Sequence, residues 1–107
     1  SVRGSTLSTG TTTIAAIGAV ATTSLIGTEQ FGLKVSASGG SGTATSPYNS
    51  SFFAYSANAS SSSQVASASV GDSATTTYAI RYLTNIAGTT NSGTYTSNLV
   101  YVATANF

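Results

Sequence analysis

The sequence contains no cysteine and no histidine, and both absences remove whole classes of chemistry. Without cysteine there are no disulfides and no thiolate metal ligands. Without histidine the commonest general base is missing, so the many serine hydroxyls have no imidazole to activate them. Tryptophan and methionine are absent too, and only one residue is proline. We therefore expect a protein that is not an enzyme and that binds no cofactor.

Charged residues are scarce. They make up 5% of the 107 residues and leave a net charge of +1, whereas an average globular protein has about 25%. Nucleic-acid binding and polybasic membrane binding both require a cluster of Lys and Arg, which three cations do not form. No apolar run reaches 18 residues, so no membrane span is predicted. Weak charge repulsion favours self-association, so we expect a homopolymer with neither a nucleic-acid nor a membrane partner.

Glu29 and Asp72 are the two carboxylates of the chain. A glycosidase pair would have to be formed by these two residues, and a calcium site would have to combine Asp72 with main-chain carbonyls. Both fall in turn-like sequence, so solvated turn residues are the favoured interpretation. The segment Gly39 to Gly42 is glycine-rich, but it opens no helix and carries no lysine, which argues against a phosphate-binding loop.

The strongest pattern in what remains is strict alternation. Phe31 to Ser36 alternates large apolar with small or polar residues, which predicts a half-buried strand. Thr75 to Ile86 and Thr94 to Thr104 are β-rich and flank a Gly/Thr/Asn connection, which predicts a hairpin over Tyr78 to Phe107. Apolar residues on both faces of the last strand suggest a central strand covered on both sides.

The other segments are weaker. Ser1 to Thr13 is expected to form a short strand leading into a turn. Ile14 to Ile26 has apolar spacing that suits either a helix or an extended buried segment, and the latter is preferred because Gly and Thr interrupt it. Ala37 to Pro47 and Asn58 to Ser63 read as loops, and Gln64 to Val70 as a weak strand of small residues.

Short strands separated by Gly/Ser/Asn turns, with no convincing helix, predict a single all-β domain over residues 1–107. The expected fold is an immunoglobulin-like antiparallel β-sandwich of about six to seven short strands. Tyr95 follows a turn and opens the closing strand, which is the position of a tyrosine corner.

Aromatic residues suggest how the core and the surface are divided. Phe52 and Phe53 are adjacent, so they cannot both face the same side of a strand. Four tyrosines fall on strand positions that the core needs, whereas two lie outside the strongest strands and are free to stack on sugars. The core set is Tyr78, Tyr82, Tyr95 and Tyr101, and the free set is Tyr48 and Tyr55.

Two stretches carry a resemblance to a known group of proteins. Residues 93–103 read Gly-Thr-Tyr-Thr-Ser-Asn-Leu-Val-Tyr-Val-Ala, and residues 27–33 read Gly-Thr-Glu-Gln-Phe-Gly-Leu. The first is similar to the closing strand Gly-x-Tyr-x-x-x-Leu/Ile-x-Tyr-x-Ala of secreted bacterial β-sandwich surface proteins, including fimbria-like filament subunits. Position 91 departs from that pattern, with Asn where Pro is frequent. The resemblance implies an extracellular, non-enzymatic subunit, joined in the fimbria-like relatives by strand donation.

The sequence therefore predicts a secreted structural subunit of an extracellular, cell-surface filament, assembled by β-strand complementation. We take the chain to be a processed chain or a fragment, and residues 1–26 to be the donated or exchanged segment. The donor side chains would be Val2, Leu7, Ile14, Ile17 and Val20. The acceptor side chains would be Val100, Val102 and Phe107.

Two alternatives share this fold. One is an adhesin-like module that binds cell-surface glycans through Tyr48 or Tyr55, and the other is a virion decoration protein. The sequons at Asn49 and Asn58 are glycosylation candidates, although an unmodified polar loop is the favoured interpretation of both.

Overall fold

The computed structural model describes residues 1–71 and 73–105, so Asp72 and Phe107 lie outside the described residues. The described chain is built from strands without a helix. The strands are β1 Val2–Gly4, β2 Leu7–Ser8, β3 Thr13–Ile14, β4 Gly18–Thr22, β5 Gln30–Gly39, β6 Thr43–Ala44, β7 Phe53–Tyr55, β8 Asn58–Ser63, β9 Ala66–Ser67, β10 Thr76–Asn85 and β11 Leu99–Tyr101.

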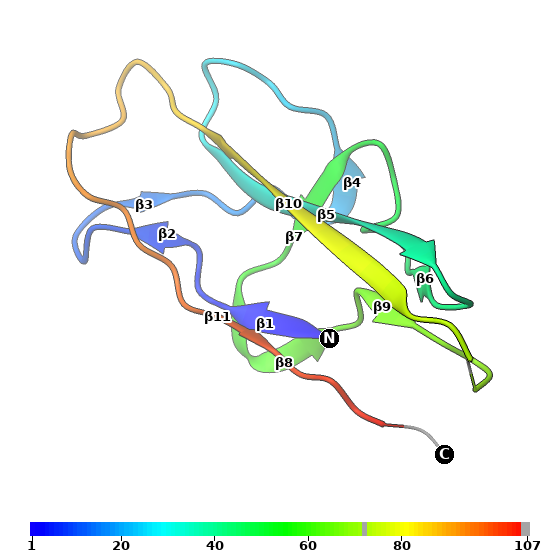
Figure 1. The fold of residues 1–107 in the computed structure, drawn as a ribbon. Coiled ribbons are helices and arrows are strands. Elements are labelled where there is room, and N and C mark those ends of the chain that lie inside the picture. The colour runs from blue at the N-terminus through cyan, green and yellow to red at the C-terminus, as the bar shows by residue number, and fades with distance from the viewer. Residues whose placement is uncertain (72, 106–107) are drawn as a thin grey trace.

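Two sheets form the body of the molecule (Figure 1). A four-stranded sheet has the order β10-β5-β7-β4, and a three-stranded sheet has the order β11-β1-β8. The pairs β2-β3 and β6-β9 form two small sheets beside them. All named strand pairs are antiparallel. The prediction of an all-β antiparallel sandwich is confirmed, with the chain divided into more strands than the six or seven expected.

The core lies between the two sheets. From the four-stranded sheet it takes the alternating residues of β5, and from the three-stranded sheet it takes Val2. Phe31 and Tyr55 pack edge to face with ring centroids 5.4 Å apart. The Tyr55 hydroxyl donates to the carbonyl oxygen of Ser5 at 3.2 Å, which links the sheets. The buried apolar residues are Val2, Ile14, Phe31, Leu33, Val35, Tyr48, Ala54, Tyr55 and Val65.

β5 follows the sequence pattern closely. Phe31, Leu33 and Val35 are buried, as their alternation predicts. The strand is longer than expected and extends to Gly39, so the predicted loop from Ala37 to Pro47 is wrong at its start, and β6 lies within it. The loop prediction failed because main-chain pairing with β10 continues through Gly/Ser sequence that carries no hydrophobic signal.

The predicted hairpin over Tyr78 to Phe107 is wrong. β10 pairs with β5 in an unbroken register, and β11 pairs with β1 in the other sheet. Residues 86–98 therefore connect the two sheets and do not close a turn. Each of the two strands is an edge strand in its sheet, so neither is central. The exposed side chains of Tyr82, Val100 and Tyr101 show that neither strand is covered on both faces. The closing strand itself extends only from Leu99 to Tyr101.

Two weaker segments had different outcomes. Ile14 to Ile26 is mostly extended, as preferred, and its residues 15–17 run beside the start of β5. The expected burial is wrong, because only Ile14 is buried and Val20 and Ile26 are largely exposed. Asn58 to Ser63 is not a loop but strand β8, which pairs with β1. Its serines are mostly exposed, so the strand is fixed by its backbone partner and no apolar alternation marks it in the sequence.

The tyrosine-corner interpretation of Tyr95 has a structural basis. Its hydroxyl donates to the carbonyl oxygen of Asn91 at 2.8 Å, four residues upstream. The hydroxyl also lies 3.2 Å from the Thr12 hydroxyl. A tyrosine that bonds back to the backbone a few residues upstream has the geometry of that corner. The contact fixes the crossing segment before β11.

Candidate functional site

The N-terminal strand β1 occupies the middle of the three-stranded sheet. Val2, Arg3 and Gly4 lie opposite Tyr101, Val100 and Leu99 of β11, and β8 pairs with the other edge of β1. The ladder continues past the strand, since Ser1 and Val102 exchange two main-chain hydrogen bonds of 2.9 Å. Val2 is 1% exposed. The first strand of the chain therefore fills a slot between two later strands.

The five donor candidates are divided by the structure. Val2 and Ile14 are buried in the core, and Leu7 and Ile17 pack against it. Val20 is 76% exposed and contributes nothing to that core. Four of the five side chains therefore complete the domain's own core in this single chain.

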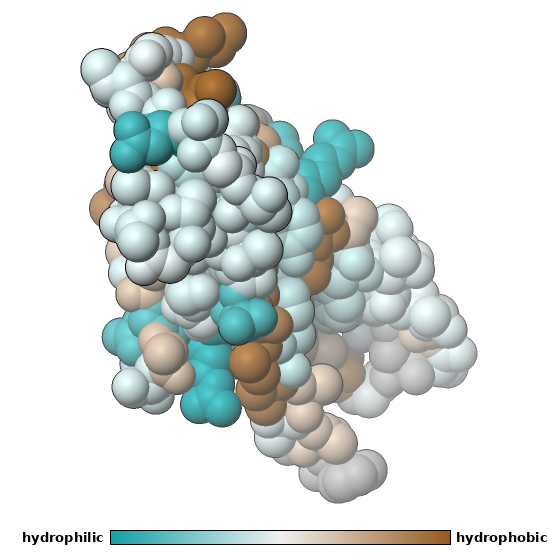
Figure 2. Space-filling view, turned by 90° about the vertical axis from the view of Figure 1, so that its left-hand side faces the viewer, coloured by the Kyte–Doolittle hydropathy of each residue, from teal (hydrophilic) through white to brown (hydrophobic). Residues whose placement is uncertain are grey.

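The acceptor candidates lie on the outside of the same sheet. Val100 and Val102 are 45% and 43% exposed, and Phe107 lies outside the described residues. Leu99 points to the core while Val100, opposite Arg3, points away from it. Figure 2 shows hydrophobic side chains gathered at one end of the molecule and in a narrow band lower down, on a surface that is otherwise mostly of intermediate hydropathy with scattered hydrophilic patches.

Most of the tyrosines lie where they were not expected: those predicted to be free are buried, and most of those predicted in the core are exposed. Tyr48 and Tyr55, expected to be free for sugars, are 2% and 1% exposed and belong to the core. Tyr78, Tyr82 and Tyr101, expected in the core, are exposed. Strand position alone misled the prediction, because the edge strands β10 and β11 leave their side chains only partly covered. Of the adjacent phenylalanines, Phe52 is exposed and Phe53 half-buried, as adjacency requires.

Two exposed tyrosines meet across the open side of the sandwich. The hydroxyl oxygens of Tyr82 on β10 and Tyr101 on β11 lie 2.6 Å apart. Partial burial and then this hydrogen bond raise the pKa of Tyr101 above its ordinary value of 10.0. Burial, with a smaller contribution from Tyr48, also raises the pKa of Tyr55. The phenols of Tyr55 and Tyr101 therefore stay protonated at neutral pH.

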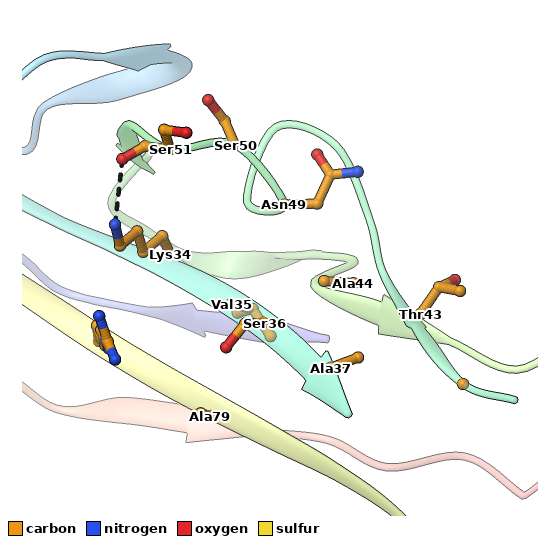
Figure 3. A pocket seen from close by; sticks show the side chains of 12 residues that line it. Lys34, Val35, Ser36, Ala37, Thr43, Ala44, Asn49, Ser50, Ser51 and Ala79 are labelled. Carbon is orange, nitrogen blue, oxygen red and sulfur yellow. Dashed lines mark hydrogen bonds between the residues drawn. The ribbon is translucent and has the colours of Figure 1, made fainter. Parts of the chain in front are cut away.

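A groove of about 620 Å³ lies on the outer face of β5 and β10, the face that points away from the core. Segments 42–44 and 49–51 form its rim. Lys34 and Arg81 are direct cross-strand partners there, so their side chains share a face. The Lys34 ammonium donates to the carbonyl oxygen of Ser51 at 3.1 Å and lies 4.9 Å from the centre of the Phe53 ring. Figure 3 shows Lys34 reaching toward Ser51, with Asn49 on the rim. Sequence reasoning missed this groove, because residues 34 and 81 become neighbours only through strand pairing.

The two sequon asparagines are both exposed. Asn49 lies on the rim of the groove. The Asn58 side-chain oxygen accepts hydrogen bonds from the backbone amides of Ser60 and Ser61 at 2.9 and 3.0 Å. Asn58 thus shapes its own strand, while Asn49 faces solvent beside a cavity.

The two carboxylates of the chain are Glu29 and Asp72. Glu29 accepts a 2.7 Å hydrogen bond from the Thr90 hydroxyl, and Asp72 is outside the described residues. Within residues 1–71 and 73–105, His, Cys, Asp and Glu side chains form no group of three that could hold a metal ion. Nor does that part of the chain contain a helix long and apolar enough to cross a membrane.

Comparison with known proteins adds no assignment to this geometry. No protein-family model matches the chain, and neither a curated protein nor a solved structure is significantly similar to it.

Proposed function

We propose that this chain is a structural subunit of an extracellular filament on a cell surface, joined to its neighbours by exchange of the N-terminal β-strand. The observation that carries the proposal is the position of β1, the first strand of the chain, between β11 and β8. If β1 leaves, both flanking strands lose their main-chain partner at once. The same strand from a second subunit restores those hydrogen bonds and refills the Val2 position.

The energetics of exchange are favourable to this mechanism. β1 has three residues and contributes one deeply buried side chain, Val2, so its withdrawal exposes little apolar surface. Every contact that is lost within one subunit is regained between two subunits, and the balance depends on the connecting residues Ser5 and Thr6. A head-to-tail exchange of this type does not close on itself and grows an open chain.

Three further observations support the assignment as a polymer subunit. β10 is a regular ten-residue edge strand that pairs on one side only with a named strand of the described chain. Such an edge presents main-chain donors and acceptors to another strand. A net charge of +1 on 107 residues gives little repulsion between copies. The resemblance of residues 27–33 and 93–103 to fimbria-like surface proteins points in the same direction.

Introduced cysteines test the exchange directly, because the chain has none of its own. Arg3 and Val100 are directly opposite, at a separation of about 4.5–5.5 Å between α-carbons, which a disulfide spans. In assembled Arg3→Cys/Val100→Cys protein, oxidation should give a ladder of covalent oligomers on a non-reducing gel. The matched pair Ser38→Cys/Thr77→Cys joins β5 to β10 within one subunit and should give closed monomers.

Electron microscopy and light scattering of the purified protein supply the second half of the test. Filaments together with the covalent ladder are the expected result. Filaments whose Arg3→Cys/Val100→Cys form closes only within monomers would refute strand exchange. A monodisperse monomer at high concentration would refute the filament itself.

A second candidate function is favoured by the groove beside Lys34 and Arg81. A polar groove of this size on an exposed sheet face suits an adhesin-like, glycan-binding module. The aromatic residues first considered for this role, Tyr48 and Tyr55, are buried and unable to stack on a sugar. Glycan binding that survives loss of self-assembly would favour this candidate over the filament.

A further inference from the structure

Two of the three cationic side chains of the protein stand next to each other. Lys34 on β5 and Arg81 on β10 are opposite one another in the antiparallel register. Like charges at directly opposite positions destabilise a sheet. In a chain with 5% charged residues, two of the three cations nevertheless share one site. The pair indicates a site that an anion would stabilise.

The one carboxylate side chain in the described part of the chain, Glu29, does not lie beside Lys34 and Arg81. Glu29 lies five residues before Lys34 along β5 and its preceding turn, or ~16 Å of extended chain. Its carboxylate oxygen accepts a hydrogen bond from the Thr90 hydroxyl. The Lys34 ammonium is held by the carbonyl oxygen of Ser51 and by the Phe53 ring, and an ammonium has three donors in all. Arg81 is exposed, and its planar fork of donors matches the two oxygens of a carboxylate.

The groove around the pair is larger than an inorganic ion needs. Its volume is about 620 Å³, within the range of roughly 300–1,000 Å³ typical of small-molecule sites. Hydroxyl and amide groups line the groove together with small apolar side chains. The polar members are Ser36, Thr43, Asn49, Ser50 and Ser51, and Ala44 and Ala79 are small apolar members (Figure 3). A saccharide likewise presents both hydroxyl groups and C–H faces.

We propose that this groove binds an acidic saccharide, with the sugar carboxylate between Arg81 and Lys34 and the sugar hydroxyls on the Asn49 to Ser51 rim. The inference deepens the second candidate function, since it names the ligand class of that glycan site. It does not depend on strand exchange, because β1 lies in the other sheet. Its failure would leave the filament proposal intact.

Titration of the ¹⁵N-labelled protein with a galacturonic acid trimer tests the proposal by NMR. We expect saturable shifts of the backbone amides of Lys34, Ser36, Asn49 and Arg81. The fully methyl-esterified trimer has the same backbone without charge and should bind at least about tenfold more weakly, because charge-assisted hydrogen bonds are lost. Sodium acetate, a carboxylate without a sugar, should also bind far more weakly.

Three variants distinguish specific binding in the groove from general attraction of the anion to a cationic protein. Arg81→Gln and Lys34→Gln should each weaken trimer binding about tenfold or more. Arg3→Gln removes the third cation, which lies in the other sheet, and should leave binding unchanged. Because both groove positions are tested separately, a failure of one variant to fold leaves the other as the test. Equal binding of the ester or of acetate, an equal loss in Arg3→Gln, or no saturable shift would overturn the proposal.

Discussion

At the scale of single residues, Gly4 shows how closely the N-terminal strand approaches its neighbour. Gly4 has a φ of 151°, and a β-carbon there would contact the carbonyl oxygen of Asn98 and lie 3.0 Å from the Leu99 α-carbon. Both obstacles are backbone atoms, which cannot rotate away as a side chain could. The end of β1 therefore requires glycine.

Gly4→Ala should accordingly lower the free energy of unfolding by about 1–3 kcal/mol, the range for strained backbone positions. Urea denaturation measures this change. Gly88→Ala is the matched control, because a β-carbon at Gly88 meets no atom within 4 Å. Equal stability of the two variants would show that β1 does not approach β11 as described.

The phenol groups predict how stability depends on pH. The pKa values of Tyr55 and Tyr101 are raised in the folded chain, first by burial and, for Tyr101, then by the Tyr82 hydrogen bond. Below pH 10 both states keep these protons, so the stabilisation is fully present. Above pH 10 the unfolded chain releases them first, so stability falls as pH rises. Urea denaturation from pH 8 to 12 should show this loss, with a shallower slope in Tyr101→Phe. An unchanged slope in that variant would contradict the assignment.

At the scale of elements, β5 is the strand on which the core depends. It pairs with both β10 and β7, and Leu33 in its first half is fully buried. Leu33→Ala should destabilise the fold by about 2–5 kcal/mol, through lost burial and the cavity left behind. Val20→Ala removes an apolar residue that is mostly exposed and should cost less than about 0.5 kcal/mol. Chemical denaturation of both variants measures the difference, and similar losses would place the core elsewhere.

β10 offers a ten-residue backbone edge with which a second copy of the chain could pair. Thr77 and Thr84 are exposed positions near its two ends. The double variant Thr77→Lys/Thr84→Lys should slow association measured by light scattering, because charges on an edge strand oppose pairing. Ser69→Lys/Thr89→Lys adds the same charge at exposed positions outside the strands. If both variants slow association equally, net charge and not the β10 edge is responsible.

At the scale of the whole molecule, we expect charge to contribute little to the free energy of unfolding. Five charged side chains give a net charge of +1. Surface ion pairs contribute little in general, and salt screens them further. The unfolding free energy should therefore change by less than about 0.5 kcal/mol between roughly 50 and 500 mM sodium chloride. A larger salt dependence in thermal or urea denaturation would reveal an electrostatic contribution beyond the repulsion between Lys34 and Arg81.

The sequence by itself determined the strand character of the chain and much of its chemistry. The alternation of Phe31, Leu33 and Val35 identifies a buried face, because side chains of a strand point to opposite sides with a period of two. The lack of cysteine and histidine excludes thiolate and imidazole chemistry wherever the strands lie. These properties belong to the residues themselves, so they survive any arrangement of the sheets.

Only the tertiary structure decided which strands are partners. A period of two defines the faces of a strand but not its neighbour, so the expected pairing of residues 78–86 with 94–104 was as consistent with the sequence as the observed pairing of β10 with β5. The position of β10 at the edge of its sheet left Tyr82 exposed, and packing of the segment between β6 and β7 buried Tyr48. Partner choice also brought Lys34 beside Arg81 and set β1 between β8 and β11. Both proposals depend on these pairings, which arise from long-range backbone hydrogen bonds and core packing.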